Sequence, residues 1–154
     1  MSTATVTSSS EITLVTLQKC PADISFLSGI FQKISELGVN IDMISLAPAH
    51  GAFTSLSFTI ADDDLGRILE YTSELQERHN IKMIVSSGNC KISVYDPHMK
   101  NTSGVAAKVF AAAADVSTDV RIITTSEVEI SLLVTQADFN ETLDAMEKKM
   151  NAEG

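Results

Sequence analysis

The feature that most restricts the fold of this chain is an internal repeat. Three pairs of residues lie 79 positions apart, namely Phe31 and Phe110, Asn40 and Asp119, and Ile44 and Ile123. Beyond one turn the spacing becomes 74, as shown by the pairs Ile60 and Val134, Asp64 and Asp138, and Leu65 and Phe139. Two constant spacings separated by one gap at a turn indicate that a single structural unit is encoded twice.

A hairpin pattern recurs in both copies. In the second copy, two apolar runs at residues 120–123 and 128–134 flank a polar Thr-Thr-Ser-Glu step. Alternation in the second run predicts a tight β-hairpin whose second strand is buried on one face. The first copy repeats the plan at residues 39–60 with a longer connection at 47–53.

Helical periodicity and capping residues predict the remaining elements. Asp23 is placed to cap a helix at residues 24–37, and Gly38 occupies the expected left-handed position after it. The three acids at 62–64 open a second helix that ends near Arg78, before Asn80. Further helices are predicted at 104–116 and 136–150, and further strands at 11–17, 54–60, 81–85 and 91–95.

The order β-α-β-β-α-β predicts an α+β fold of two ferredoxin-like units, with antiparallel sheets and helices on one face. The first unit covers residues 11–86 and the second 88–150, with a boundary at 86–88. The second copy lacks its last strand because residues 151–154 are too short and polar to form one. Residues 4–7 lie in a Ser/Thr-rich stretch that reads as a loose tail, but our hypothesis is that they supply that strand. The first unit would then be inserted within the second.

Composition excludes several classes of function. The chain has 11 basic and 20 acidic residues, for a net charge of −9, which disfavours nucleic acids and anionic membranes as partners. Without a signal peptide or a long apolar run, we expect a soluble cytoplasmic protein. Cys20 and Cys90 are predicted to be buried or incidental thiols, and the three scattered histidines predict no metal site. No catalytic signature and no cofactor motif is recognisable.

The residues that surround the predicted hairpins resemble a known family. Residues 38–44 (Gly-Val-Asn-Ile-Asp-Met-Ile), 103–110 and 123–131 are similar to the tandem ACT domains that form the regulatory half of aspartate kinases. The resemblance extends from about Ile12 to Met150, and the Thr-Ser-Glu step is its most specific part. It implies side-by-side pairing of ACT units and a homodimer.

The same resemblance implies a sensor of lysine or threonine type and not an enzyme. The Gly-rich phosphate loop of the kinase domain is missing, so the chain looks like a free-standing regulatory module with a possible separate catalytic subunit. The alternative is a dimerisation or docking module that partners a catalytic subunit without binding a ligand.

Physical chemistry suggests where an amino acid would bind. Backbone N–H groups at the start of the residue 24–37 helix suit its carboxylate, and the side chains of Asn40 and Asp42 suit its ammonium. The resemblance implies that effectors bind where the strand-to-helix loop of one ACT unit meets a strand of another. By family position, the predicted effector-binding residues are Ala22, Asp23, Ile24 and Ser25, with Asn40, Ile41 and Asp42 facing them. A predicted interface or secondary site comprises Ser103, Gly104, Val105, Asp119, Thr125, Ser126 and Glu127.

Several residues depart from the family pattern or have a simpler explanation. Leu46 and the Ile24-Ser25 pair differ from residues common in the family, which puts threonine specificity in doubt. Asp119 replaces the Asn of the first copy, which weakens the case for a second working site. Thr125, Ser126 and Glu127 equally fit ordinary turn chemistry.

Overall fold

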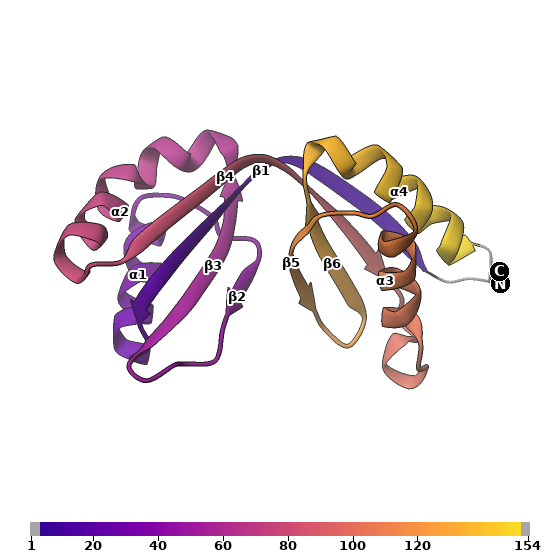
Figure 1. Ribbon diagram of the computed structural model, residues 1–154, viewed down its shortest axis with the longest axis horizontal. Coiled ribbons are helices and arrows are strands. Elements are labelled where there is room, and N and C mark those ends of the chain that lie inside the picture. The colour runs from indigo at the N-terminus through magenta and orange to yellow at the C-terminus, as the bar shows by residue number, and fades with distance from the viewer. Residues whose placement is uncertain (1–3, 152–154) are drawn as a thin grey trace. The chain divides into compact units, whose positions relative to one another are not determined.

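A computed structural model describes residues 4–151 of the chain (Figure 1). The chain divides into two compact units. The first unit is Glu11–Ser87, and the second combines the described parts of Met1–Ser10 and Gly88–Gly154. The amino-terminal segment therefore belongs to the same unit as the carboxy-terminal one, which is the arrangement that the insertion hypothesis requires.

Both units are built on antiparallel strands. The strands are β1 (Thr5–Pro21), β2 (Ile44–Leu46), β3 (Phe53–Ala61), β4 (Lys82–Tyr95), β5 (Val120–Thr125) and β6 (Glu129–Val134). The strand order is β2-β3-β1-β4 in the first unit and β1-β4-β6-β5 in the second, because β1 and β4 pass through both units. The prediction of an α+β fold with antiparallel sheets is confirmed.

The two long strands correct the sequence analysis. Residues 5–10 are part of β1 and not a loose tail, and the strands predicted separately at 81–85 and 91–95 are one strand, β4. The division between the units falls within β4, between Ser87 and Gly88. Each strand contains one residue in the left-handed region at the junction between the units, Glu11 with φ of 58° and Gly88 with φ of 73°. A single such residue bends a strand without ending it, as in a bulge.

The four α-helices match their predictions within a few residues. They are α1 (Ile24–Glu36), α2 (Leu65–His79), α3 (Val105–Asp115) and α4 (Gln136–Asn151), with short 3-10 turns at Asp62–Asp64 and Met99–Asn101. The predicted caps are confirmed, since Asp23 caps α1 and the left-handed residues Gly38 and Asn80 follow α1 and α2. Among residues 4–151, no helix has both the length and the apolar character needed to cross a bilayer.

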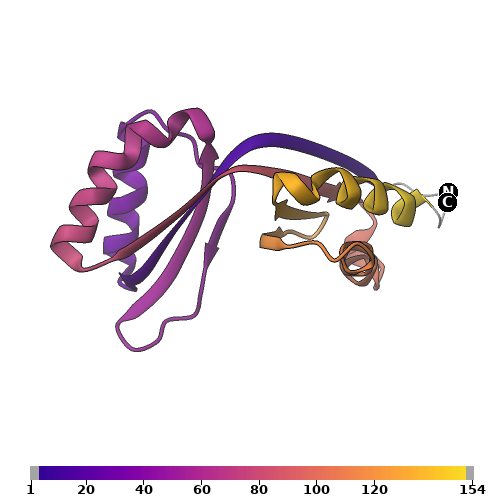
Figure 2. The ribbon, with the colours of Figure 1, turned by 45° about the horizontal axis from the view of Figure 1, so that its top comes forward.

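Each unit has its own hydrophobic core. In the first unit, Ile30 and Ile34 of α1 and Ile68 of α2 are buried with Phe58 of β3. Both helices therefore cover the same face of the strands (Figure 2). The second core contains Val109 and Met146 from α3 and α4, and the partly buried Ala4 and Val6 pack against it. The amino-terminal strand segment thus contributes apolar side chains to the second core.

The strand pairing confirms the internal repeat. Ile44 pairs with Phe58 in the first unit, and Ile123 pairs with Leu132 in the second. Ile123 lies 79 positions after Ile44, and Leu132 lies 74 positions after Phe58, so the two pairs are equivalent at the repeat spacings. The next pair agrees as well, since Ser45 with Ser57 corresponds to Thr124 with Ser131.

Two strand predictions were only partly right. Residues 39–43 run beside β3, where the Asp42 N–H bonds to the Thr59 carbonyl, but regular pairing in β2 begins at Ile44. The strand β6 is buried on both faces and not on one, since Ser131 and Leu133 are as inaccessible as Leu132. Ser131 is accommodated by a 2.8 Å hydrogen bond to the Ser93 hydroxyl.

Candidate functional site

The predicted effector site begins at the loop between β1 and α1. Asp23 has extended backbone geometry, and its carboxylate accepts a 3.2 Å hydrogen bond from the Ser25 N–H. Its carbonyl accepts the first helical bond, from the Leu27 N–H. One of the N–H groups that the sequence analysis offered to a ligand carboxylate is therefore already bonded. The cap also places a negative charge where that carboxylate would approach.

The loop is held against the hairpin turn that joins β2 to β3. The Ala22 N–H donates a 2.9 Å hydrogen bond to the Ala52 carbonyl, and Pro21 pairs with Phe53. Beneath the loop Cys20 is fully buried, and burial raises the pKa of its thiol. Both cysteines are buried and neither forms a disulfide, as predicted.

The second part of the predicted site lies elsewhere in the unit. Asn40 follows the end of α1, where Gly38 reverses the chain and the Val39 N–H bonds to the Ile34 carbonyl. Because α1 has 13 residues, its two ends are about 20 Å apart at the usual helical rise. Asn40 and Asp42 are exposed, whereas Ile41 packs against the core.

Within one copy, Asp23 and Asn40 therefore cannot contact the same amino acid. The predicted arrangement, in which the loop of one ACT unit faces a strand of another, stays a prediction. The length of the intervening helix is visible in the sequence, and it separates the two groups whatever the details of packing. A site that uses both groups needs a second chain.

An apolar edge connects these two groups, and the sequence analysis did not single it out. Ile44 and Leu46 of β2 and Phe53 of β3 are each about half exposed, and Ile24 at the start of α1 is 74% exposed. The strand β2 is at one end of the strand order, so among the described residues nothing pairs with its outer edge. Ile44 and Leu46 pair with the core residues Phe58 and Leu56, so they lie on the helix-bearing face beyond the cover of the helices. In the sequence, this edge could have been recognised as a short apolar strand followed by a turn that contains Pro and Gly.

The predicted secondary site is divided between structural roles. Asp119 donates its N–H to the Asp138 carboxylate over 2.9 Å and lies 3.6 Å from the Arg121 side chain. Ser126 accepts hydrogen bonds from the N–H groups of Val128 and Glu129, so its hydroxyl stabilises the hairpin turn. These contacts support the turn-chemistry explanation for Ser126.

The remaining residues of the predicted secondary site lie at the start of α3 and at the tip of the hairpin between β5 and β6. Gly104 precedes α3 with φ of 95° and no side chain caps the helix, while Val105 is buried. Ser103, Thr125 and Glu127 are exposed. The loop before α3 is tied to the hairpin by a 2.8 Å hydrogen bond from the Asp96 N–H to the Val128 carbonyl. The second unit therefore repeats the loop-to-hairpin contact of the first.

No group of three His, Cys, Asp or Glu side chains suited to a metal ion occurs in residues 4–151. The described residues also place His79 in a packing role, since its ring meets Phe26 edge to face with centroids 4.7 Å apart. The candidate site is thus a pair of loops beside an apolar strand edge, with polar groups suited to binding.

Comparison with known proteins agrees with this architecture. The ACT domain family model matches residues 92–150. These residues are therefore similar to an ACT domain, and the chain has the fold of an aspartate kinase regulatory subunit.

More particularly, the chain is similar to aspartate kinase regulatory regions over nearly all its length. The regulatory subunit of aspartate kinase from Thermus flavus is 25% identical with a TM-score of 0.85, over 94% of this chain and 95% of that one. Aspartate kinase from Synechocystis is 27% identical with a TM-score of 0.88, over 95% of this chain and 26% of that one. An aspartokinase from Bacillus sp. (strain MGA3) is 30% identical over 94% of this chain. The chain spans only 35% of the length of that aspartokinase.

Proposed function

We propose that this chain is a regulatory ACT-domain protein that binds a small amino acid between two copies of its first unit. The observation that carries the proposal is the exposed apolar edge of β2, which separates the two groups of candidate ligand residues. It explains why those groups are far apart in one copy and how they would meet in a pair.

The geometry of strand pairing supplies the argument. When two β2 strands pair in antiparallel fashion, residues that precede β2 in one copy lie opposite residues that follow β2 in the other. Asn40 and Asp42 precede β2, and the turn that follows β2 is bonded to the α1 loop through Ala22 and Ala52. A second copy would thus bring its Asn40 and Asp42 toward Asp23, and would also cover Ile44 and Leu46.

The chemistry of the pair favours a basic effector. The remaining N–H groups at the start of α1 suit a carboxylate, while the Asn40 and Asp42 side chains suit an ammonium. Asp23 and Asp42 both bring negative charge, which a second ammonium on the effector would balance. We therefore propose a lysine-type ligand ahead of a threonine-type ligand.

The proposed role is regulation and not catalysis. The similarity to a regulatory subunit supports a separate catalytic partner, whose contacts would change when the effector binds. Such coupling between two sites is reciprocal and typically amounts to about 1 to 3 kcal/mol.

One observation favours the alternative, a docking module without a ligand. The Asp23 carboxylate already caps α1 at the place intended for the ligand carboxylate. In that case the apolar β2 edge would serve pairing alone, either with a second copy or with a catalytic subunit.

A thermal-shift panel of the twenty amino acids, followed by sedimentation velocity, tests the proposal. A ligand that binds the folded state raises the melting temperature by an amount that grows with the logarithm of its concentration relative to Kd. We expect lysine to raise the melting temperature at millimolar concentration and to shift the sedimentation coefficient. No response to any amino acid, with a dimer that persists, would establish the docking module instead.

A further inference from the structure

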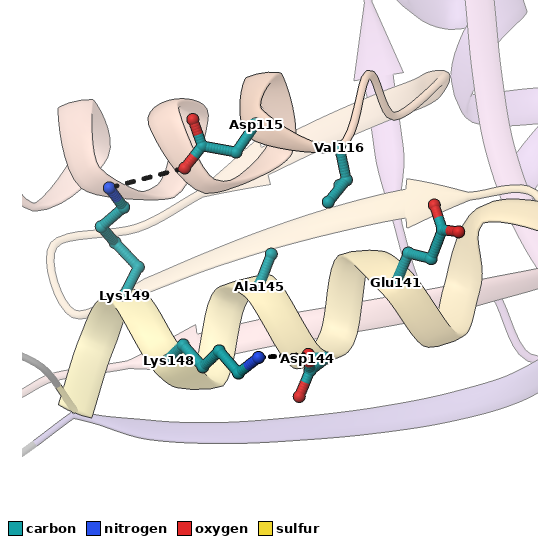
Figure 3. Close-up of a pocket in the computed structure, with 7 residues that line it drawn as sticks. All are labelled: Asp115, Val116, Glu141, Asp144, Ala145, Lys148 and Lys149. Carbon is teal, nitrogen blue, oxygen red and sulfur yellow. Dashed lines mark ion pairs between the residues drawn. The ribbon is translucent and has the colours of Figure 1, made fainter.

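The second unit has a groove between α3 and α4 that belongs to neither candidate site. Its volume is about 450 Å³. Figure 3 shows its floor and its two ends. Val116 and Ala145 lie between the two helices, Glu141 lies at one end, and the ion pair between Lys149 and Asp115 lies at the other.

The internal repeat shows that this groove is a specific property of the second unit. The first unit has a groove at equivalent positions, with a volume of only about 180 Å³. Its residues Leu37, Arg67, Glu70, Tyr71 and Glu74 correspond to Val116, Glu141, Asp144, Ala145 and Lys148 at the repeat spacings. Where the first unit has the ring of Tyr71, the second has only the methyl group of Ala145.

The charges also differ between the two grooves. Arg67 and Glu74 in the first unit are replaced by Glu141 and Lys148, so the order of charge along the helix is reversed. Glu141 and Lys148 are seven positions apart on one face of α4, which is about 10 Å along a helix. The small side chain of Ala145 lies between them. The groove therefore has a carboxylate at one end, an apolar middle, and two lysines paired with Asp144 and Asp115 toward the other end.

The existing ion pairs leave one charge available. Lys148 lies 3.0 Å from Asp144, and Lys149 lies 3.6 Å from Asp115 across the groove. Glu141 has no ion pair among residues 4–151. An ammonium group of a ligand can pair with Glu141, and a carboxylate can share the lysines, because each lysine ammonium has three donors.

We propose that the α3–α4 groove binds a linear amino carboxylate whose ammonium and carboxylate lie at opposite ends of a methylene chain. Its ammonium pairs with Glu141, its carboxylate with Lys148 and Lys149, and its methylenes cover Ala145 and Val116. This site is independent of the proposed effector site, which recognises an ammonium and a carboxylate on the same carbon.

A titration with 6-aminohexanoate, followed by amide chemical shifts, tests the proposal. With one charge-assisted hydrogen bond of about 2.8 Å at each end, 6-aminohexanoate is long enough to connect Glu141 with Lys148. We expect saturable shifts at millimolar concentration in the groove walls, at residues 112–116 and 141–149. Hexylamine and hexanoate, each with a single charge, should bind about two- to fivefold more weakly, since each loses one ion pair.

Two variants distinguish the groove from any other location. Ala145→Tyr introduces the residue that the repeat carries at the equivalent position, and we expect it to weaken binding by more than about tenfold by filling the space. Glu141→Gln keeps the shape and should weaken binding about two- to fivefold, the range for one exposed ion pair. Ala145→Leu serves in place of the tyrosine variant where that variant has lost the wild-type amide spectrum.

Several results would overturn the proposal. They are shifts that do not saturate, shifts outside the groove walls, and unchanged affinity in a folded Ala145 variant. Equal binding of hexylamine and of 6-aminohexanoate would exclude the two-ended recognition. The effector proposal is tested separately, because its ligands are α-amino acids and its residues lie in the first unit.

Discussion

The Asp23 carboxylate accepts a 3.2 Å hydrogen bond from the backbone N–H of Ser25 and so caps α1 from within the candidate effector site. This bond couples the stability of the helix to the binding of a ligand carboxylate. A ligand carboxylate that approaches the start of α1 must share the positive end of the helix dipole with the Asp23 carboxylate, or must displace that side chain. Substitutions at this position therefore separate the two roles.

We expect Asp23→Asn to retain stability and to bind an acidic group more tightly. Asn caps helices about as well as Asp, so the unfolding free energy should change by less than about 0.5 kcal/mol. Removing the negative charge should increase the affinity for an amino acid with a single ammonium, such as threonine, about two- to fivefold, whereas lysine loses the Asp23 charge that balances its second ammonium. Asp23→Ala should instead lower the unfolding free energy by about 1 kcal/mol. Urea denaturation and calorimetric titration measure both quantities, and equal affinity in wild type and Asp23→Asn would place the ligand carboxylate elsewhere.

We expect Ile44→Lys to prevent pairing of two copies through β2. The charge would replace an apolar group that a second strand must cover, and lysine on an edge strand opposes further strand addition. Sedimentation velocity should show a monomer, while the stability of the monomer changes by no more than about 0.5 kcal/mol because the side chain is half exposed. Phe110→Lys is a matched control, since Phe110 is equally exposed on α3. Loss of the dimer in the control alone would move the interface to the second unit.

Deletion of residues 1–10 should destabilise the second unit by several kcal/mol. The deletion removes the contacts of the partly buried Ala4 and Val6 with the core and uncovers one edge of β4. Apolar burial and the hydrogen bonds of a strand edge are therefore lost together. Hydrogen exchange should show increased opening in residues 90–94 and 130–134 before the first unit is affected. Val6→Asp is a milder variant that should act in the same direction. An unchanged urea midpoint in both variants would show that the segment is dispensable.

Stability should fall above about pH 9 because of Cys20. Burial raises the pKa of its thiol above the ordinary value of 9.0, so the folded state holds its proton more tightly than the unfolded state. The contribution is complete below the unfolded pKa and is lost as pH rises, at no more than about 1.4 kcal/mol per pH unit for one group. Tyr71 acts in the same direction above pH 10, because burial, with Cys20 and Glu74, raises its pKa.

Denaturation midpoints between pH 8 and 10.5 measure this slope. Cys20→Ala should lower stability at every pH through the cavity that it leaves, but it should flatten the decline. If stability declines as steeply with pH in Cys20→Ala as in wild type, the decline belongs to other titratable groups. The variant Tyr71→Phe identifies the part of the decline that belongs to the tyrosine.

Local sequence was sufficient for the helices and insufficient for the site. Periodic apolar residues with caps at Asp23, Gly38 and Asn80 predicted the helices, because these signals act within a few residues. The strands β1 and β4 were divided in the prediction because Glu11 and the Ser-Ser-Gly stretch before Asn89 look like interruptions, whereas strand pairing continues through them. The site is limited for a different reason. The 13 residues of α1 hold Asn40 and Asp23 apart in one unit, and sequence does not determine which other unit supplies the facing group.

The groove beside Ala145 shows what the repeat could have revealed without a structure. Tyr71 and Ala145 are equivalent by spacing, and the change from a large to a small residue at one position of two similar helices predicts a space in only one of them. The volume of that space depends on how closely α3 approaches α4, which the spacing does not determine.

The continuity of β1 has a consequence for synthesis on the ribosome. Residues 5–10 emerge before the strands that they join, because the other strands of their unit begin at residue 88 and end at 134. During translation, Glu11–Ser87 is complete and able to fold as a unit before the rest is made. The first strand segment must therefore remain unpaired until the neighbouring part of β4 is made, about 80 residues later, or roughly 4 to 16 seconds at ordinary elongation rates. Its five polar residues Thr5, Thr7, Ser8, Ser9 and Ser10 suit a segment that waits in water before it joins its strand partner.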